Sequence, residues 1–508
     1  MTDINLCPFL RIAVVLILGI IVGDAIAAPV LSWVVVTLLS VVITFAVYRS
    51  SILQSLMVML STFLFGCWLI TVEESSGNVS LPIGEQEYRA VIVSQPVVHG
   101  KVMMMDMIIT DGAMKGRKVK ASILRDTISN RQDILNIGYG VDFYAQLEEP
   151  EDFHTGSKFN YRRWLQIHGF VAHTFILPDA WQTAKLDLHG LSFMNRFELA
   201  INKFRQNLLV RYRDLHLQDQ DYAIVAAMTL GDKTMLSNQT KDNYSIVGAS
   251  HLLAVSGLHL GIIYVILSFL FDGKKLRLWG QGVILVAVWA YVALTGMSPS
   301  VMRAATMITV YSISSILNRD RFSLNTLAAT AVLLLVSNPL SLWDVSFQMS
   351  FLAMLGIFTF YKPIYAIIPK KYIFSSSFLS FFWGLIVVSI SAQIMTVPIV
   401  AYYFGRFSCY SILTNLIAIP AATFILYAAV GMFVLAPVTP LQSWVAHAMA
   451  VVADYLNHLL MYISRIPGAS IEGINIDILH VILLYCLIAC LVVVVYRFSS
   501  RKKVRIND

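Results

Sequence analysis

Charged side chains are scarce in this sequence. Asp, Glu, Lys and Arg make up 13% of its 508 residues, about half of the roughly 25% that is usual in soluble domains. Hydrophobic residues make up 57%, and the mean hydropathy is +0.70. This composition excludes an ordinary soluble protein and predicts a polytopic membrane protein. The formal net charge of +7 says little about nucleic acid, because a basic cluster at 497–505 is typical of a cytoplasmic anchor.

Cysteine is absent from the large polar region of the chain, where a disulfide could stabilise a domain. The chain has five cysteines, and none lies between Glu73 and Gly248. The large polar region between them therefore has no internal disulfide and no cysteine-based metal site. The sequence also lacks a Gly-x-x-x-x-Gly-Lys-Ser/Thr phosphate loop and a His-x-His-x-Asp-His motif. We expect no nuclease or ATPase activity, no catalytic residue, no cofactor and no metal in this chain.

Long apolar segments are abundant. Three come first, at about 9–30, 31–48 and 52–72, and each is near the ~20 residues that a spanning helix needs. Residues 1–72 are therefore predicted to be an N-terminal three-helix membrane segment. Nine more follow, at approximately 251–271, 279–296, 299–317, 323–337, 344–361, 377–402, 408–435, 443–463 and 478–496. The predicted fold class is a polytopic α-helical membrane protein with about 12 transmembrane helices and an inserted extracytoplasmic β domain.

Four basic segments set the predicted orientation. Three of them begin at Asp272, Asn318 and Lys370, and the fourth is the tail 498–508. They follow the first, third, fifth and ninth of the later apolar segments, respectively. If the polar region before Gly248 lies outside, these crossings place all four basic segments in the cytoplasm, as the positive-inside rule requires. We therefore predict a membrane domain at 248–497, followed by a basic cytoplasmic tail.

Residues 85–185 show the pattern of short strands. Turn signals such as Asp111-Gly112 separate alternating or apolar runs, so this region is predicted to be a small all-β domain, either a barrel or a sandwich. A helix-like insert at Phe159–His168, before the last run, fits an OB-like barrel. The runs are 88–95, 102–110, 117–124, 141–148 and 170–177.

Residues 190–247 are predicted to be an amphipathic, interfacial helical linker. From Phe193 to Leu217 apolar residues recur at three- and four-residue steps, with arginine and lysine on the other faces. A basic amphipathic helix of this kind often lies on a membrane surface. A helix packed on its own protein explains the same pattern equally well.

Polar residues at the start of the apolar run after Gly248 are costly in a bilayer and need a reason. His251 and His259 lie within about 80° of each other if both are on one helix, with Ser256 one turn before His259. A metal site is disfavoured because the nearest acids, Asp242 and Asp272, lie beyond this segment. Hydrogen bonding between helices explains these residues as well as pore lining does.

Later segments carry further polar positions. Arg303 lies one turn into a predicted helix, where it either reaches to the membrane interface or attracts phosphate. Asp344 and Gln348 share a helical face. Singly, such residues usually join helices, and together they favour a channel or transporter over a scaffold. The candidate pore-lining residues are His251, Ser256, His259, Arg303, Asp344, Gln348, Gln393 and Asn415.

Several ordered blocks of this sequence resemble the ComEC family of competence proteins, the inner-membrane channels that take up transforming DNA. The blocks are Ala227–Lys233 (AMTLGDK), Gly248–Leu260 (GASHLLAVSGLHL), Ser298–Ala304 (SPSVMRA), Asn338–Pro339, Phe347–Phe351 (FQMSF), Gln393–Pro398 and Asn415–Pro420. Phe159–Leu165 (FNYRRWL) resembles part of the extracytoplasmic OB-like domain of that family. The resemblance covers most of the chain.

The resemblance implies passage of single-stranded transforming DNA across the bacterial inner membrane during natural competence. Many family members end in a metallo-β-lactamase-like domain that this sequence lacks, so a separate nuclease is an expected partner. A periplasmic DNA receptor, a cytoplasmic ATPase motor and membrane lipids are the other expected partners. The alternatives are a transporter of another polymer, nucleotide or lipid, and a membrane-embedded hydrolase that uses Ser256 or His259.

Two basic clusters in the β region are candidates for contact with DNA. The region as a whole has twelve Lys or Arg and twelve Asp or Glu between Glu85 and Lys185, so it has no global positive field. Aromatic residues beside arginines can stack on bases, and a solvated strand face and a small core helix explain the same residues. The candidates are Lys115, Arg117, Lys118, Lys120, Arg162, Arg163 and Trp164.

Overall fold

The computed structural model describes residues 7–26, 28–77, 80–126, 131–150, 158–185, 190–215, 219–271, 277–316, 324–369, 371 and 376–504. Contacts divide the chain into two compact units. Unit 1 falls within residues 1–154, 160–235 and 255–344, and unit 2 within residues 155–159, 236–254 and 345–508.

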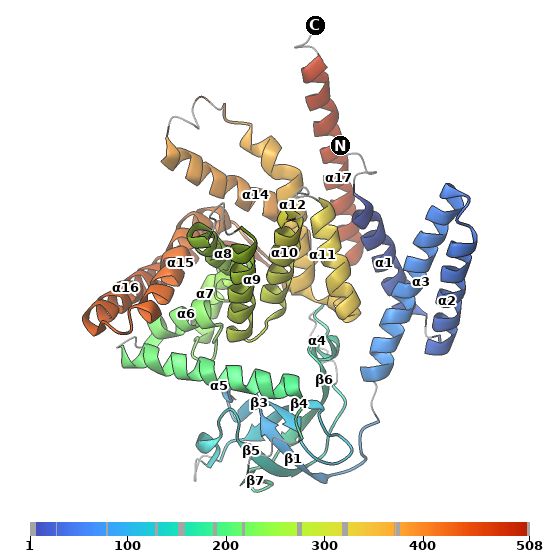
Figure 1. The fold of residues 1–508 in the computed structure, drawn as a ribbon. Helices are drawn as coiled ribbons and strands as arrows, with labels where there is room; N and C mark the ends of the chain where they lie inside the picture. The colour runs from blue at the N-terminus through green and yellow to red at the C-terminus, as the bar shows by residue number, and fades with distance from the viewer. Residues whose placement is uncertain are drawn as a thin grey trace. The chain divides into compact units, whose positions relative to one another are not determined.

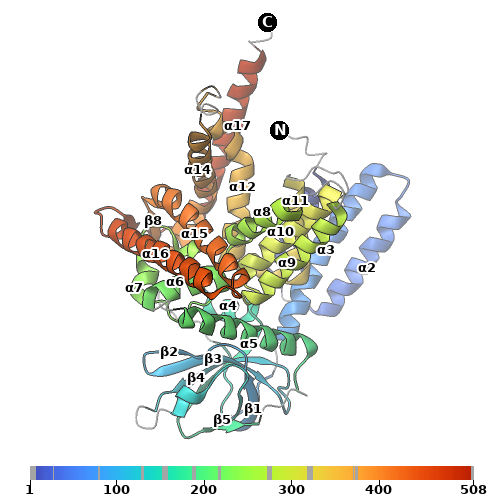
Figure 2. The ribbon, with the colours of Figure 1, turned by 60° about the vertical axis from the view of Figure 1, so that its left-hand side comes forward.

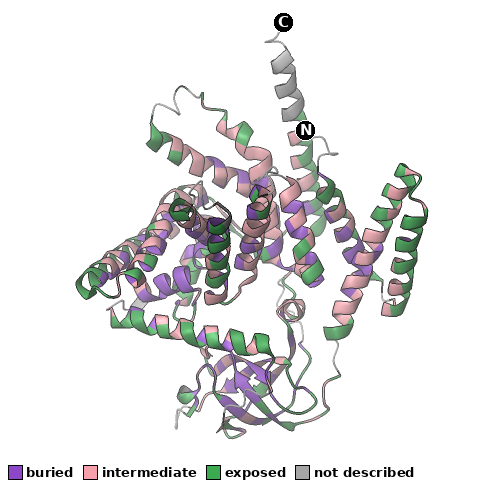
Figure 3. Ribbon diagram, viewed as in Figure 1, coloured by how far each residue is buried: buried purple, intermediate pink, exposed green. Residues whose placement is uncertain are grey.

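Unit 1 begins with three packed helices, labelled in Figure 1: α1 (Pro8–Ala25), α2 (Val30–Ala46) and α3 (Ser51–Gly77). Glycines let α1 and α3 meet backbone to backbone. A Cβ on Gly19 would lie 2.1 Å from the carbonyl oxygen of Phe63, and one on Gly66 would lie 2.7 Å from that of Leu16. Small residues at such contacts are typical of helices that pack in membranes. Among its described residues α2 buries only Ser40, so Figure 3 shows most of its apolar length as exposed or half-buried.

The polar region of unit 1 folds into a seven-stranded mixed sheet. Its strands are β1 (Gln86–Ile92), β2 (Val97–His99), β3 (Val102–Ile109), β4 (Lys118–Leu124), β5 (Gly140–Ala145), β6 (Phe170–Ile176) and β7 (Trp181–Ala184). The order is β6-β4-β3-β1-β5-β7 with β2 paired to β3, and only β4 and β6 run parallel. The five predicted strands are confirmed. β2 and β7 were not predicted, because three or four residues are too few to show an alternation.

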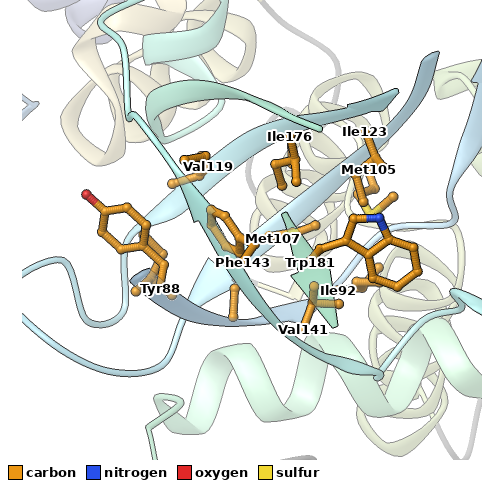
Figure 4. Packing of buried hydrophobic residues seen from close by; sticks show 14 of the residues in the cluster. Tyr88, Ile92, Met105, Met107, Val119, Ile123, Val141, Phe143, Ile176 and Trp181 are labelled. Atoms are coloured by element: carbon orange, nitrogen blue, oxygen red, sulfur yellow. The ribbon is translucent and has the colours of Figure 1, made fainter. Parts of the chain in front are cut away.

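The core of this region lies on the inner face of the sheet. Met105, Met107, Phe143 and Trp181 meet there in one buried cluster, which Figure 4 shows from close by. β4 alternates strictly between half-buried and buried positions, as a strand does when only one of its faces meets the core. The outward positions of β4 are thereby left for its lysines.

Helix α5 (Phe193–Asp214) is packed on its own protein, between the sheet and α6 (Asp219–Leu230). Figure 2 shows α5 running along the sheet. Asn202 donates a hydrogen bond from Nδ2 to the carbonyl oxygen of Val93 at 3.0 Å. The hydroxyls of Tyr212 and Thr229 lie 3.0 Å apart, and burial raises the pKa of Tyr212. These contacts favour the interpretation of this segment as a helix packed on its own protein, and a position at the membrane surface stays a prediction.

Further helices complete the two units. Unit 1 also contains η2 (Arg131–Ile134), α4 (Tyr161–Ile167), α8 (Gly257–Phe271), α9 (Arg277–Leu294), α10 (Pro299–Ile316), α11 (Leu324–Ser337) and η4 (Pro339–Trp343). Unit 2 contains α7 (Asn238–Ile246), η3 (Ser250–Leu252), α12 (Val345–Tyr365), α14 (Ser377–Phe404), β8 (Arg406–Ser408), α15 (Ser411–Val434), α16 (Thr439–Ser464), β9 (Ser470–Glu472) and α17 (Ile478–Val504).

Every predicted apolar segment contains a helix in the part of the chain that the structure describes, although the segment at 251–271 is divided between η3 and α8. Within the described ranges, five helices are long and apolar enough to cross a membrane: α1, α3, α12, α14 and α15. Five shorter apolar helices lie in α2, α8, α9, α11 and α17. The number of twelve crossings therefore stays a prediction. So does the orientation, because the basic segments at 272–276 and 318–321, Lys370 and the end of the tail lie outside the described residues.

Candidate functional site

A Ser256–His259 pair caps the start of α8. The backbone N–H of Ser256 donates to Nδ1 of His259 at 3.2 Å, and the serine hydroxyl lies 3.0 Å from the same nitrogen. His259 is the third residue of α8, so it takes the place of the Glu or Gln in a capping box. Because a backbone N–H can only donate, Nδ1 accepts, and we assign the buried imidazole as neutral with its proton on Nε2.

The expectation that His251 shares this helix is wrong. α8 begins at Gly257, after the Ser256 cap, and His251 lies in the separate short helix η3. The apolar run at 251–271 concealed this break, because Leu252 and Leu253 are buried although they lie outside α8. The angular argument that placed the two histidines on one helical face therefore does not apply.

α10 carries a buried charge in its second turn. Arg303 is 4% exposed and follows Pro299, the first residue of the helix. Its Nη2 donates to the Ser300 hydroxyl at 3.4 Å, and it interacts electrostatically with Asp344, which is 7% exposed. A buried charge is costly without an opposite charge. Arg303 is therefore buried within unit 1, where Asp344 helps to compensate its charge. Its two interpretations, reaching to the membrane interface and attracting phosphate, both stay predictions.

In unit 2, two polar candidates join α14 to α15. Gln393 donates from Nε2 to the Ser411 hydroxyl at 2.9 Å, and Asn415 donates from Nδ2 to the Ser389 hydroxyl at 3.3 Å. Hydrogen bonds of this kind are common between helices in membranes. Gln348 lies half-buried on α12.

The structure therefore brings the eight path candidates together only in part. Unit 1 contains Ser256, His259, Arg303 and Asp344, and unit 2 contains His251, Gln348, Gln393 and Asn415. A single path past all eight stays a prediction.

The first basic cluster of the β region is divided between a strand face and the turn before it. The ammonium groups of Lys118 and Lys120 lie 4.8 and 5.3 Å from the ring centroid of Phe170. Lys120 also forms an ion pair with Asp106 at 2.7 Å. Lys115 is exposed in the turn before β4. The strand lysines thus have structural contacts, whereas Lys115 is presented to solvent.

The second basic cluster lies on α4, and its two arginines have different surroundings. Arg163 donates from Nη1 to Oδ2 of Asp24 at 3.3 Å and from Nη2 to the other carboxylate oxygen. Its guanidinium also lies 3.8 Å from the ring centroid of Trp343. Arg162 forms an exposed ion pair with Glu149 at 3.6 Å. Arg163 thus ties α4 to the end of α1 and to η4.

Trp164, the aromatic residue of the second cluster, also makes contacts within the protein. Trp164 stacks with Tyr161 at a centroid distance of 5.9 Å and tilts against His168 at 4.3 Å. Leu165, the next residue, is fully buried. These contacts favour the interpretation of α4 as a small core helix.

A second interaction between opposite charges was not predicted. Arg205 of α5 is half-buried; desolvation lowers its pKa, and the nearby charge of Asp232 opposes this shift. Asp232 itself is 6% exposed and accepts a hydrogen bond from the backbone N–H of Thr234 at 3.0 Å. A Cβ on Gly296, whose φ is +83°, would lie 2.8 Å from Nη1 of Arg205. The tight turn between α9 and α10 therefore favours glycine at position 296, because the backbone is in the left-handed region and because a Cβ there would crowd Arg205.

Known proteins resemble this chain over most of its membrane part. A family model described as Competence protein matches residues 228–498. ComE operon protein 3 of Bacillus subtilis is 27% identical over 366 residues, which cover 70% of this chain and 43% of the relative. An uncharacterized protein of Aquifex aeolicus is 33% identical over 162 residues, which cover 32% of this chain and 36% of the relative.

A third relative is the uncharacterized protein YcaI of Escherichia coli, 22% identical over 217 residues, which cover 40% of this chain and 28% of the relative. The chain therefore spans less than half the length of these relatives. No solved structure matches. Asp232, Ser256, His259, Arg303 and Asp344 all lie inside the segment that the family model matches.

Proposed function

The chain belongs to the Competence protein family, and on this premise we propose that it is the channel that carries single-stranded transforming DNA across the bacterial inner membrane. The family supports a role in DNA uptake during competence. Five helices of sufficient length and hydropathy support insertion in a membrane. DNA passage through this chain itself is the further step that we propose.

The observation that carries the proposal is a group of polar side chains at the ends of apolar helices in unit 1. They are Ser256 and His259 at the start of α8, Arg303 near the start of α10, and Asp344 directly after η4. The starts of α8 and α10 meet, because a Cβ on Gly257 would lie 3.3 Å from the Cβ of Ala304. Ionisable side chains inside membrane segments are often functional, and several of them together favour a substrate path.

We assign different roles to the members of this group. Arg303 provides the positive charge that attracts the DNA phosphates, and Asp344 helps to hold that charge in place. The Ser256–His259 pair fixes the start of α8 beside it. The other proposed path residues are His251, Gln348, Gln393 and Asn415 of unit 2.

In this proposal the β region is an OB-like domain outside the inner membrane. Its topology supports this: β1, β3 and β4 form a meander, β4 pairs parallel with β6, and β1 also pairs with β5. An isolated bridge between Glu148 and His173 links the segment after β5 to β6, which is how a partly open five-stranded barrel closes. The exposed Lys115 and Arg162, with Lys118 and Lys120, would meet the incoming strand, while Arg163 and Trp164 hold α4.

The proposed topology has twelve spans, the β domain outside and the C-terminus in the cytoplasm. A periplasmic DNA receptor, a separate nuclease for the strand that stays outside, and a cytoplasmic ATPase motor would be the partners. No phosphate-loop or metallonuclease motif occurs in the sequence, which is why the last two activities are assigned to other proteins.

Proteoliposomes test the proposal directly. The purified chain would be reconstituted with a single-strand-binding protein trapped inside, and a labelled oligonucleotide would be added outside. We expect the single strand, but neither duplex DNA nor a mononucleotide, to become protected from external nuclease. Arg303→Gln should abolish protection, and folding of that variant would be checked by size-exclusion chromatography. Passage of mononucleotides or lipid without DNA would favour the transporter, and product formation that depends on Ser256 would favour the hydrolase.

A further inference from the structure

A pocket of about 450 Å³ lies within unit 1, where the end of α3 meets α4, β6 and η4. It is lined by Glu73, Glu74, Ser76, Gly77, Arg117, Asn160, Arg162, Arg163, Gln166, Gly169, Val171 and Leu340. Its walls therefore carry both arginine and glutamate side chains. A ligand of a single charge sign would meet repulsion from one of these sets.

Two of the charges that line this pocket are not compensated within the described residues. Arg162 pairs with Glu149, and Arg163 pairs with Asp24 and, at 3.9 Å, with Glu74. Among the residues that the structure describes, Arg117 and Glu73 take part in no ion pair, although both line the same pocket. A ligand with one anionic and one cationic group would satisfy both.

The pocket lies at the ends of two candidate spanning helices. Glu73 and Glu74 lie in the last turns of α3, Asp24 is the penultimate residue of α1, and η4 follows the end of α11. α1 and α3 are both candidate spans. The ends of spanning helices lie at the level of the phospholipid headgroups.

An apolar groove on the same helices supplies a place for an acyl chain. It has a volume of about 390 Å³ and is lined by side chains of α1, α2, α3 and α11, including Leu16, Phe65 and Val336. Val336 is four residues before Leu340, which lines the charged pocket. From Phe65 to Glu73 the rise along α3 is about 12 Å, which is shorter than an extended acyl chain.

We propose that this pocket binds the headgroup of a zwitterionic phospholipid that carries a primary ammonium group, as in phosphatidylethanolamine. Arg117 binds the phosphate and Glu73 binds the ammonium group, while the acyl chain lies in the groove between α1, α2 and α3. A DNA backbone fits less well, because it offers phosphates to the arginines but nothing cationic to Glu73 and Glu74. This inference depends on α1 and α3 crossing a membrane, and it does not depend on DNA transport.

Native mass spectrometry of the full chain in detergent tests the inference. Phosphatidylethanolamine and phosphatidylglycerol with identical acyl chains would be added separately, so that only the headgroup differs. We expect the ethanolamine lipid to bind about ten-fold more tightly, and Glu73→Gln to abolish this preference. Arg117→Gln should weaken both lipids about ten-fold, which is typical for the loss of one charge-assisted hydrogen bond.

Two matched controls remove the same charges outside the pocket. Lys115→Gln lies in the same turn as Arg117, and Glu87→Gln lies on the exposed side of β1; neither should change lipid binding. Equal binding of both lipids, or equal binding by all variants, would overturn the inference in favour of unselective lipid contact. Displacement of the bound lipid by a short single-stranded oligonucleotide would instead identify the pocket as part of a DNA surface. Selective lipid binding that persists in a chain unable to transport DNA would still support the inference that this pocket binds a lipid headgroup.

Discussion

Replacing Arg163 with glutamine should release α4 from the membrane helices of unit 1. The arginine makes two hydrogen bonds to Asp24 at the end of α1, and its guanidinium stacks on Trp343 of η4. Glutamine keeps some of the side-chain length but loses the charge and the planar fork that fits a carboxylate. The helix itself should still form, because its cap, Asn160 Oδ1 accepting from the backbone N–H of residue 163, does not involve the side chain.

The free energy that Arg163→Gln should cost follows from how exposed the Arg163–Asp24 ion pair is. The side chains of Arg163 and Asp24 are 24% and 20% exposed, between exposed pairs, which contribute about 0.2–1 kcal/mol, and buried pairs, which cost about 3–5 kcal/mol to break. We therefore estimate about 2 kcal/mol for the ion pair and about 1 kcal/mol for the contact with Trp343. A loss of about 3 kcal/mol corresponds to a change of roughly 100-fold in a local opening equilibrium.

Amide hydrogen exchange of the full chain in detergent measures this opening. Protection of 161–167 should fall roughly 100-fold in Arg163→Gln. The matched control is Arg162→Gln on the same helix, whose ion pair with Glu149 has side chains 46% and 67% exposed and should contribute about 0.5 kcal/mol or less. Asp24→Asn should reproduce most of the effect, and the double variant should add little. Equal protection in the Arg162 and Arg163 variants would refute the reasoning.

Variants at three further sites test other parts of the account, each by thermal unfolding in detergent. His259→Ala should destabilise by about 1 kcal/mol because the capping box is lost, whereas His259→Gln, which can still accept at that position, should be close to wild type. Gly19→Ala should cost about 1–3 kcal/mol, since its Cβ would lie 2.1 Å from a carbonyl oxygen of α3; Gly431→Ala, with nothing within 4 Å, is the control and should not destabilise. Arg303→Gln should cost about 3 kcal/mol, and adding Asp344→Asn should recover part of it; no recovery would show that the two charges are not coupled.

Local patterns predicted the elements of this chain well. Apolar runs identified every helix that carries a predicted span, because a helix in lipid must be apolar over most of its length. Alternation identified the five longer strands, because one face of each meets the core. The break between η3 and α8 was missed for the same reason, since buried leucines continue the apolar run through a segment that is not part of α8.

Local sequence patterns could not predict contacts between residues that are far apart in the sequence. Arg163 and Asp24 are 139 positions apart, and nothing in the local sequence of either residue indicates the other. Arg205 and Asp232 were missed likewise, because each looks like an ordinary surface charge until α5 and α6 are packed. For the same reason the sequence indicated polar residues for a path but not which of them compensate one another, as Arg303 and Asp344 do.

The central claim is that this chain admits DNA to the cytoplasm, and the most direct measurement follows labelled double-stranded DNA in host cells with and without its gene. The account predicts that, without the gene, DNA still reaches the space outside the inner membrane but no labelled strand enters the cytoplasm, and that restoring the gene restores entry. Unchanged entry of the labelled strand in cells that lack the gene would contradict it.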